Sequence, residues 1–323
     1  MLTVLIATRN GARTLPRCLG ALAGLTSPPG GWKLVVVDNG STDATREIVA
    51  SFADRLPLTF LVEPRHGKNA ALNAGLGSVE GDLVVFTDDD TLPRPDWLVE
   101  MRRAADEHRS FSIFGGSVLP CWEVTPQHWI TAWVPRTVVF TLTDPTWEEG
   151  PLWPGYVFGP NMAIRADIFI AGHRFDPSIG PRAGQYAMGS ETEFVLRLDK
   201  TGATAWYCKQ ATVEHMIRAF QMKRSWILGR ARRYGRGKYR LSIHHQNTGR
   251  KKILGVPGYL LRELCKKGFD VIRAKLHGDA AKLFERRWVF HFLLGQAIEA
   301  HALRKESQSE DKLATESSYH VSK

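Results

Sequence analysis

The sequence predicts an α/β fold, with a mostly parallel sheet flanked by helices and a basic helical C-terminal extension. Three observations lead to this prediction. Through the first hundred residues, short runs rich in Val, Leu and Ile alternate with segments of helical periodicity. These runs are apolar throughout, which is typical of strands buried on both faces of a parallel sheet, with helices as right-handed crossovers. Beyond Met216 the chain becomes helical and rich in Lys and Arg.

The predicted strands of this first part each end at polar residues. The first strand, Leu2–Thr8, runs into a turn, and a helix follows with its apolar residues at helical spacing. Ser41 and Thr42 are candidates to cap the next helix. The remaining strands are expected at 33–40, 58–63 and 82–90, with helices over 41–53 and 67–76.

The rest of the chain divides into three parts by composition. Residues 100–189 mix short strands with many Trp and Pro residues, before a helix over 191–203 and a strand over 205–209. We therefore expect one domain over 1–230, with halves of about 1–100 and 101–230, a basic helical extension over 231–305 and a disordered polar tail over 306–323.

Composition excludes several classes of protein. The 323 residues are 43% hydrophobic and 24% charged, which is not the composition of a disordered or collagen-like chain. The four cysteines lie far apart without a CxxC pair, which argues against a zinc ribbon and favours reduced thiols in a cytosolic compartment. No targeting signal is recognised before the first strand, and the apolar stretch Trp288–Ile298 is shorter than the ~20 residues of a membrane-spanning helix.

The net charge of +10 is unevenly distributed. Residues 216–305 hold 22 basic and 5 acidic residues, a net +17, whereas residues 1–215 hold 19 basic and 24 acidic residues, a net −5. A basic block on an acidic body predicts an anionic partner such as membrane lipid, nucleic acid or a polyphosphate.

One helix of the basic block is a candidate to lie on a membrane. Leu283, Phe284, Trp288 and Phe292 can share one helical face, and Arg286 and Arg287 flank it. An apolar face flanked by basic residues is typical of a helix in a bilayer interface. The alternative is a helix packed within the protein with its basic side in solvent.

Polar residues follow three predicted strands at the edge of the sheet where ligands bind in open parallel folds. They are Thr8 to Asn10, Asp38 with Asn39, and the triplet Asp88, Asp89 and Asp90. Alternation directs Asp88 and Asp90 to one side, where carboxylates suit Mg²⁺ or Mn²⁺. No glycine-rich dinucleotide or P-loop motif follows the first strand, which disfavours nicotinamide and P-loop chemistry.

Several segments together resemble the family 2 inverting glycosyltransferases, which have a GT-A type nucleotide-binding fold. They occur in the expected order within residues 2–230: VLIATRNGARTL, VVVDNGSTDATREI, GKNAALNAGLGSVEGDLVVFTDDDTLPRPDWL, FGPNMAIRADIF, HRFDP and GSETEFVLRLDKTGATAWYCKQATVEH. The resemblance implies transfer of a single sugar from a nucleotide-diphosphate donor to an acceptor hydroxyl, with Mg²⁺ or Mn²⁺, and makes 1–100 the donor half and 101–230 the acceptor half.

The resemblance also implies roles for single residues. The donor would be bound by residues on three strand ends and one helix: Thr8 and Asn10 in the nucleotide pocket, Asp38 at the base, Lys68 near the nucleotide, Asp88 at the ribose and Asp89 beside it. The metal would be held by Asp90 and His215, and histidine is also the commonest metal ligand.

The candidate general base is Glu191, in the segment GSETEF. The family usually has a Glu-Asp pair here, and Ser190 replaces the Glu. Glu193 is a rival for the base, and both acids are also favourable simply because they begin a helix. Gly159, Asn161 and Glu193 are expected on the acceptor side.

Two other functions remain open from the sequence. A nucleotidyltransferase would carry a glycine-rich basic loop, of which ATRNGARTL is a poor version, and KRSWILGRARRYGRGKYR suits an RNA-binding protein. The catalytic motifs favour sugar transfer in polysaccharide or glycolipid synthesis, without a nucleic acid partner. The expected acceptor is a glycan or a lipid-linked sugar, and the expected location is the cytoplasm, with peripheral contact at the anionic inner face of the cell membrane.

Overall fold

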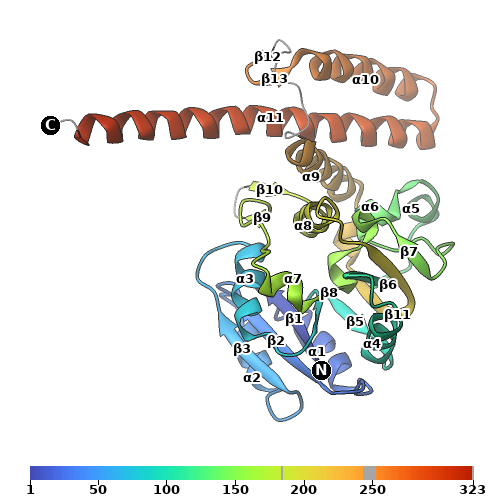
Figure 1. The fold of residues 1–323 in the computed structure, drawn as a ribbon. Coiled ribbons are helices and arrows are strands. Elements are labelled where there is room, and N and C mark those ends of the chain that lie inside the picture. The colour runs from blue at the N-terminus through green and yellow to red at the C-terminus, as the bar shows by residue number, and fades with distance from the viewer. Residues whose placement is uncertain (183–184, 243–251, 322–323) are drawn as a thin grey trace. The chain divides into compact units, whose positions relative to one another are not determined.

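The computed structural model describes residues 1–182, 185–242 and 252–321 and divides into two compact units (Figure 1). Unit 1 comprises Met1–Pro126, Pro135–Gln185 and Gly189–Ala219, and unit 2 comprises Gln127–Val134, Tyr186–Met188 and Phe220–Lys323. The first unit thus ends before the expected residue 230, and the chain leaves it twice to contribute short segments to the second.

Unit 1 is built on a mixed sheet with the strand order β3-β2-β1-β4-β8-β6-β11-β5, and β7 pairs with β11. The four strands predicted from apolar runs are parallel neighbours: β1 (Leu2–Thr8), β2 (Trp32–Asp38), β3 (Leu58–Val62) and β4 (Leu83–Thr87). The other five strands are β5 (Thr91–Pro93), β6 (Ile113–Trp122), β7 (Gly150–Leu152), β8 (Met162–Arg165) and β11 (Ala205–Ile217). Beyond β4 the sheet is mixed: β8 is antiparallel to both β4 and β6, whereas β6 and β11 are parallel to each other.

Helices connect these strands. The α-helices of unit 1 are α1 (Leu15–Ala23), α2 (Thr45–Ala50), α3 (Lys68–Gly75), α4 (Trp97–Glu107), α6 (Arg136–Phe140), α7 (Ala166–Ile170) and α8 (Ser190–Asp199). Of these, α1, α2, α3 and α8 were predicted from periodicity, and α4, α6 and α7 were not. Short 3-10 turns lie at η1 (Leu76–Ser78), η2 (Pro154–Tyr156) and η3 (Gly159–Asn161), and two short strands are β9 (Gly180–Arg182) and β10 (Gln185–Ala187).

The prediction that Ser41 or Thr42 caps α2 is wrong. The helix begins only at Thr45, and the carboxylate of Asp43 accepts hydrogen bonds from the Thr45 amide at 3.1 Å and from its hydroxyl at 2.5 Å. Thr42 instead donates its amide to the side chain of Asn10, 2.8 Å away. The loop before α2 is therefore bound to the loop after β1, which competes with an earlier helix start.

An aromatic cluster fixes α8 against the sheet. Phe86 of β4 meets Phe175 with ring centroids 5.4 Å apart, and Phe175 meets Phe194 of α8 at 4.3 Å. Phe169 of α7 stacks on Phe194 at 5.7 Å. These rings belong to a larger buried core that α3, α7 and α8 form with the sheet. Packing of this density holds the start of α8 in place relative to the end of β4.

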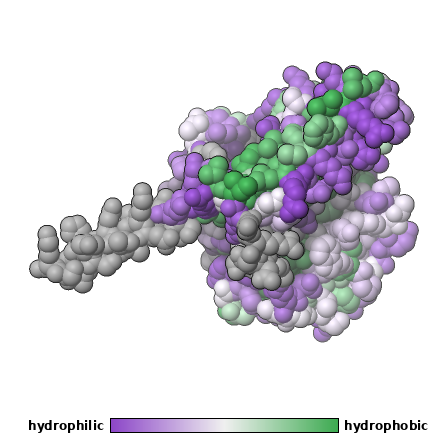
Figure 2. Space-filling view, turned by 90° about the horizontal axis from the view of Figure 1, so that it is seen from above, coloured by the Kyte–Doolittle hydropathy of each residue, from purple (hydrophilic) through white to green (hydrophobic). Residues whose placement is uncertain are grey.

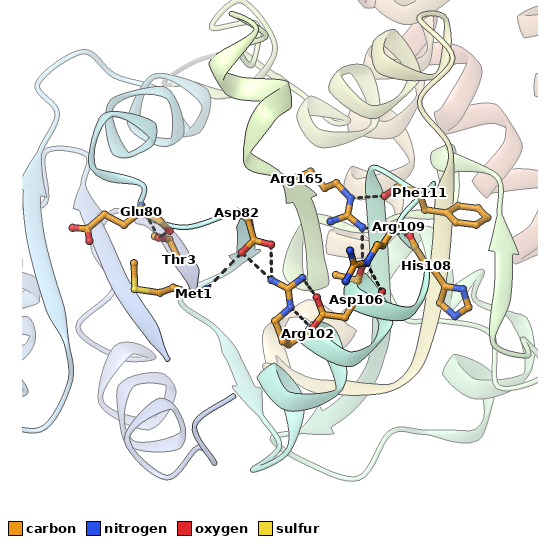
Figure 3. A network of polar contacts seen from close by, with 11 residues as sticks. Met1, Thr3, Glu80, Asp82, Arg102, Asp106, His108, Arg109, Phe111 and Arg165 are labelled. Carbon is orange, nitrogen blue, oxygen red and sulfur yellow. Dashed lines mark hydrogen bonds and ion pairs between the residues drawn. The ribbon is translucent and has the colours of Figure 1, made fainter. Parts of the chain in front are cut away.

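A polar network lies at the opposite edge of the sheet, where β1 and β4 begin (Figure 3). The Arg102 guanidinium of α4 is almost fully buried and donates to Asp82, before β4, at 2.8 and 2.9 Å. It also donates to Asp106 at 2.6 and 3.0 Å. Arg165 of β8 donates to the carbonyl oxygens of Ala105 and Phe111. These bonds fasten α4 to the sheet far from the strand ends that carry the candidate site.

Unit 2 is helical, as the sequence predicts for its basic part. Its helices are α5 (His128–Trp133), α9 (Arg224–Ser242), α10 (Gly258–Leu276) and α11 (Ala280–Val321), with η4 (Ala219–Met222) at its start and a small hairpin of β12 (Lys252–Ile253) and β13 (Val256–Pro257). The backbone of α11 continues as a helix through 306–321, where composition predicted disorder. In the three described ranges, no helix is long and apolar enough to cross a membrane.

Two glycines let α9 and α11 cross closely. A Cβ on Gly235 would lie 2.0 Å from the Phe292 carbonyl oxygen, and one on Gly295 would lie 2.0 Å from the Arg232 carbonyl oxygen. Nearby, Glu299 of α11 is fully buried and accepts hydrogen bonds from Arg236, at 2.6 Å, and from Arg240. Part of the basic charge of this unit is therefore paired in its interior.

The helix face expected to lie on a membrane is instead packed within unit 2. Phe284 is 5% exposed, and its ring meets Trp129 edge-on with centroids 5.5 Å apart. Phe292 packs against Tyr234 of α9 at 5.4 Å. Leu283 and Trp288 are only partly exposed. The alternative of a packed helix is correct for this face.

Candidate active site

The polar residues predicted to meet at one edge of the sheet do so in unit 1. Thr8 pairs in register with Asp38 across β1 and β2, and Ile6 pairs with Thr87 across β1 and β4. The triplet that follows Thr87 therefore lies beside Thr8, at the carboxyl ends of parallel strands. The three aspartates have different partners and so form three separate contacts.

Asp88 is joined to the start of α8 through a lysine. The Lys68 ammonium lies 2.5 Å from Oδ1 of Asp88 and 2.6 Å from Oε1 of Glu191. Burial acts to lower the pKa of Lys68, but the two carboxylates outweigh burial and raise that pKa. Burial raises the pKa of Asp88, and Lys68 opposes the rise. The lysine is thus charged and holds both acids in one ion-pair cluster.

Glu191 is held from three sides. Lys68 binds one of its oxygens, and the Ser190 hydroxyl donates to the other at 2.6 Å. A Cβ on Gly159 would lie 2.7 Å from Oε1 of Glu191, so the carboxylate occupies space that only glycine leaves open. Burial acts to raise the pKa of Glu191, but Lys68 outweighs it and lowers that pKa to about 2.

Glu193 does not join this cluster. Its carboxylate accepts hydrogen bonds from Arg197, one turn later on α8, at 2.8 and 3.1 Å. Such an i,i+4 ion pair is a common arrangement within a helix. The geometry thus favours Glu191 over its rival as a base.

Asp89 faces Thr8, whose hydroxyl donates to its Oδ2 at 2.5 Å. Burial and the neighbouring charge of Asp90 raise the pKa of Asp89 to about 7. A Cβ on Gly11 would lie 2.4 Å from the Thr8 hydroxyl oxygen and 2.8 Å from Asp89 Oδ2. The turn after β1 therefore approaches this pair closely because residue 11 is glycine.

Asp90 faces His215 of β11. Oδ1 of Asp90 lies 3.5 Å from Nε2 of His215, and Oδ2 lies 3.5 Å from a guanidinium nitrogen of Arg218. Burial acts to raise the pKa of Asp90, but the basic side chains of His215 and Arg218 outweigh burial and lower that pKa. For His215, burial lowers the pKa, and Asp90 outweighs it, so that the pKa is raised.

The side chains of Asp90 and His215 are of kinds that can bind a divalent cation. Nδ1 of His215 lies 2.7 Å from the Phe140 carbonyl oxygen, which can only accept a hydrogen bond. In the neutral ring, Nδ1 therefore carries the proton and the lone pair of Nε2 faces Asp90. This is how proteins orient a histidine that binds metal. Among residues 1–182, 185–242 and 252–321, no group of three or more His, Cys, Asp or Glu could hold a metal ion. A cation bound by this pair would need further oxygen ligands.

Asn10 and Asp38 lie at the same edge but hold its loops. Asn10 has a φ of 54°, and its backbone N–H donates a hydrogen bond to the Ser41 hydroxyl oxygen at 2.8 Å. Asp38 is fully buried, and its oxygens accept hydrogen bonds from the Ser41 amide at 2.9 Å and from Arg46 at 3.0 Å. The two residues shape the rim beside Thr8.

The side chain of Asn161 does not reach the acceptor side. It is fully buried, donates to the carbonyl oxygens of Ser117 and Ala211 at 2.8 Å, and accepts from the Trp97 indole at 2.8 Å. The prediction for this side chain is wrong, because it ties β6 and β11 to α4. Sequence reasoning also missed Arg218, because its contact with Asp90 joins residues far apart in the chain and has no local signal.

The N-terminal half of the chain matches a known family model. Residues 3–171 match the model described as Glycosyl transferase family 2. The chain is also 35% identical, over 285 residues, to Glycosyltransferase AglE of Haloferax volcanii, covering 84% of this chain and 88% of that protein.

The chain belongs to glycosyl transferase family 2.

This glycosyltransferase is also similar to a second curated enzyme and to solved structures. Glucosyl-dolichyl phosphate glucuronosyltransferase of Haloferax volcanii is 22% identical over 62% of this chain and 64% of its own length. Among solved structures, Staphylococcus aureus TarS 1-349 in complex with UDP-GlcNAc matches with a TM-score of 0.54 at 16% identity, covering 90% of both chains. Mannosyltransferase PcManGT of Pyrobaculum calidifontis in complex with GDP-Man and Mn²⁺ matches with a TM-score of 0.53 at 18% identity, covering 99% of this chain and 80% of its own. The predicted GT-A fold is confirmed, and family membership decides for a glycosyltransferase over the nucleotidyltransferase and the RNA-binding protein.

Proposed function

We propose that this glycosyltransferase transfers a single sugar from a nucleoside-diphosphate sugar to an acceptor hydroxyl. The transfer inverts the configuration of the anomeric carbon and uses a divalent cation. The observation that supports this most is the buried Glu191 carboxylate, fixed by Lys68, Ser190 and the space at Gly159. The complexes of TarS with UDP-GlcNAc and of PcManGT with GDP-Man and Mn²⁺ support the class of donor and the cation.

In the proposed reaction, an Oε atom of Glu191 accepts the proton of the acceptor hydroxyl as its oxygen forms a bond to the anomeric carbon. The bond from that carbon to the diphosphate oxygen breaks on the opposite side, and its electron pair leaves with the nucleoside diphosphate. Thr8, Asn10, Asp38, Lys68, Asp88 and Asp89 surround the donor on this proposal. Asp90 and His215 would hold the cation, whose charge offsets that of the departing diphosphate.

The Lys68 ion pair bears directly on the base. A carboxylate with a pKa of about 2 is a weak proton acceptor, since the best catalytic pKa lies near the working pH. We therefore propose that Lys68 shifts toward the diphosphate when the donor binds. Loss of its charge from Glu191 then raises the pKa of the carboxylate for catalysis.

The acceptor that we propose is a glycan or a lipid-linked sugar, at the cytoplasmic face of the cell membrane. The likeness to an enzyme named for glucosyl-dolichyl phosphate supports a lipid-linked substrate. The four free cysteines fit a reducing compartment.

Glu191→Gln tests the proposal, with Glu193→Gln as a matched control on the same helix. We expect the first variant to lose ~10²–10⁴-fold in kcat with unchanged donor affinity, and the control to keep most activity. NMR of the product should show the anomeric configuration inverted relative to the donor. Retention of configuration, or full activity of Glu191→Gln, would contradict the mechanism.

A further inference from the structure

The exposed surface of α10 is made of two kinds of side chain. Its exposed residues are apolar or basic, and none of them is acidic: Cys265, Phe269, Ile272 and Leu276, with Arg262, Lys266, Arg273 and Lys275. The two acids of the helix, Glu263 and Asp270, are partly buried, and Asp270 pairs with Lys267 at 3.1 Å. The fully exposed charges of α10 are therefore all positive, and Asp270, whose side chain is 34% exposed, is neutralised by Lys267.

The apolar residues form a continuous stripe. Phe269 is 73% exposed, Ile272 58% and Leu276 82%, at spacings of three and four residues. Such spacing puts them on one face of the helix, and Cys265 extends it by one turn. The opposite face, with Leu260 and Leu264, packs against α11 in the core of unit 2. Packing within this unit therefore accounts for one side of α10 only.

The neighbouring hairpin continues the same composition. Lys252, Ile253 and Leu254 are exposed, the two apolar residues at 61% and 64%, just before α10 begins. Figure 2 shows an apolar band bordered by hydrophilic side chains across this part of the molecule. Contiguous exposed apolar surface of this kind marks an interaction site.

We infer that the α10 stripe and the hairpin tip dock on an anionic lipid surface. Apolar side chains on one helical face enter the interface, and flanking basic residues bind the headgroups. A second copy of the chain fits less well, because a twofold contact through this face would place the basic residues of one copy against those of the other. This surface differs from the one that the sequence predicted to contact a membrane, which is the packed face of α11.

The inference rests on the proposed function only in its purpose, since a lipid-linked acceptor would be reached at such a surface. Its test uses neither donor nor acceptor, so the two proposals fail separately. The full chain is mixed with phosphatidylcholine vesicles, with and without phosphatidylglycerol, and binding is measured by flotation. We expect binding to the anionic vesicles that weakens as salt rises.

Two variants locate the surface. Phe269→Ser with Leu276→Ser should lose at least ~10-fold in vesicle affinity, whereas Ile170→Ser, which changes an 85% exposed residue of unit 1, should keep it. Arg262→Gln with Lys266→Gln and Arg273→Gln should lose ~10²-fold for anionic vesicles, since each basic residue near the surface contributes ~5-fold. The same charge removed at Arg55, Arg109 and Lys200 of unit 1 is the control.

A fluorescent label gives an independent measurement. Cys265 is exposed on the stripe, so an environment-sensitive dye attached there in a Cys121→Ser background should shift to the blue on anionic vesicles. Three results would overturn the inference. These are absence of vesicle binding at low salt, equal loss in the control variants, and a lipid-free dimer that the Phe269→Ser and Leu276→Ser changes dissociate.

Discussion

Lys68 couples two acids that would otherwise repel each other in a buried site. Its ammonium lies within 2.6 Å of both Asp88 and Glu191. One lysine thus stabilises the charged form of a donor-binding residue and of the proposed base. Substitution of this residue should therefore change the titration of Glu191 as well as donor affinity.

We predict that Lys68→Met moves the acidic limb of the kcat/KM profile to higher pH. In the donor-free native chain, Lys68 keeps the pKa of Glu191 at about 2, so the base is ionised in the free enzyme that kcat/KM for the donor reports. Without that charge, burial raises the pKa of Glu191 above its ordinary value of about 4.3, and activity falls as pH drops through it. Lys68→Arg keeps the charge and should keep a flat acidic side. A flat profile for Lys68→Met would contradict the coupling.

Gly159 is the second residue on which the base depends. Gly159→Ala should lower kcat by ~10²-fold while donor affinity stays within about twofold, because a methyl group would displace the Glu191 carboxylate. The φ of Gly159 is not positive, so the effect is one of space alone. Gly77→Ala, where a Cβ would meet nothing within 4 Å, is the control. Calorimetry with the nucleoside diphosphate separates binding from turnover.

For single residues, the sequence was informative about which polar side chains follow the strands and less informative about which side chains they contact. The aspartate triplet was identified because it directly follows a predicted strand, and Glu191 because the segment GSETEF resembles a motif of the family. The Lys68–Glu191 contact joins residues far apart in the chain, and no local pattern predicts it. Asn161 was misassigned because a buried amide that binds three neighbours and an amide in a binding site look alike in a sequence.

At the scale of elements, the aromatic cluster connects the core to the site. Phe175→Ala should lower the free energy of unfolding by ~3–5 kcal/mol, since Phe175 is 1% exposed and contacts Phe86 and Phe194. Urea denaturation followed by fluorescence measures this. Ile170→Ala, on the exposed side of α7, should change the stability by less than ~0.5 kcal/mol. Equal stability of the two variants would show that α8 is held by other contacts.

Elements with strong periodicity were predicted well, and those defined by long-range pairing were not. The parallel strands β1 to β4 follow from apolar runs. The antiparallel β8 is four residues long and pairs with strands on both sides, which no local signal shows. The packed face of α11 and the exposed stripe of α10 have similar compositions, and only the tertiary contacts distinguish them.

At the scale of the whole molecule, each unit has its own core and its own charge. Glu299→Gln should destabilise unit 2 by roughly 3–5 kcal/mol, because it leaves Arg236 and Arg240 without a buried carboxylate. Donor affinity, which we assign to unit 1, should stay unchanged in calorimetry. Glu285→Gln, at a 62% exposed side chain, is the control for stability. A parallel loss of donor binding would mean that the cores do not act separately.

The course of the chain between the units decides how the protein can be cut. Residues 127–134 lie early in the sequence and yet belong to unit 2, where Trp129 packs on Phe284. A fragment that stops at Ala219 would keep Trp129 and Ile130 but lose the helix that covers them. Such a fragment would expose apolar side chains that are covered in the full chain, and we expect it to aggregate on expression. A usable catalytic fragment therefore needs a short polar segment in place of residues 127–134. A domain boundary chosen from the sequence would not have shown this need.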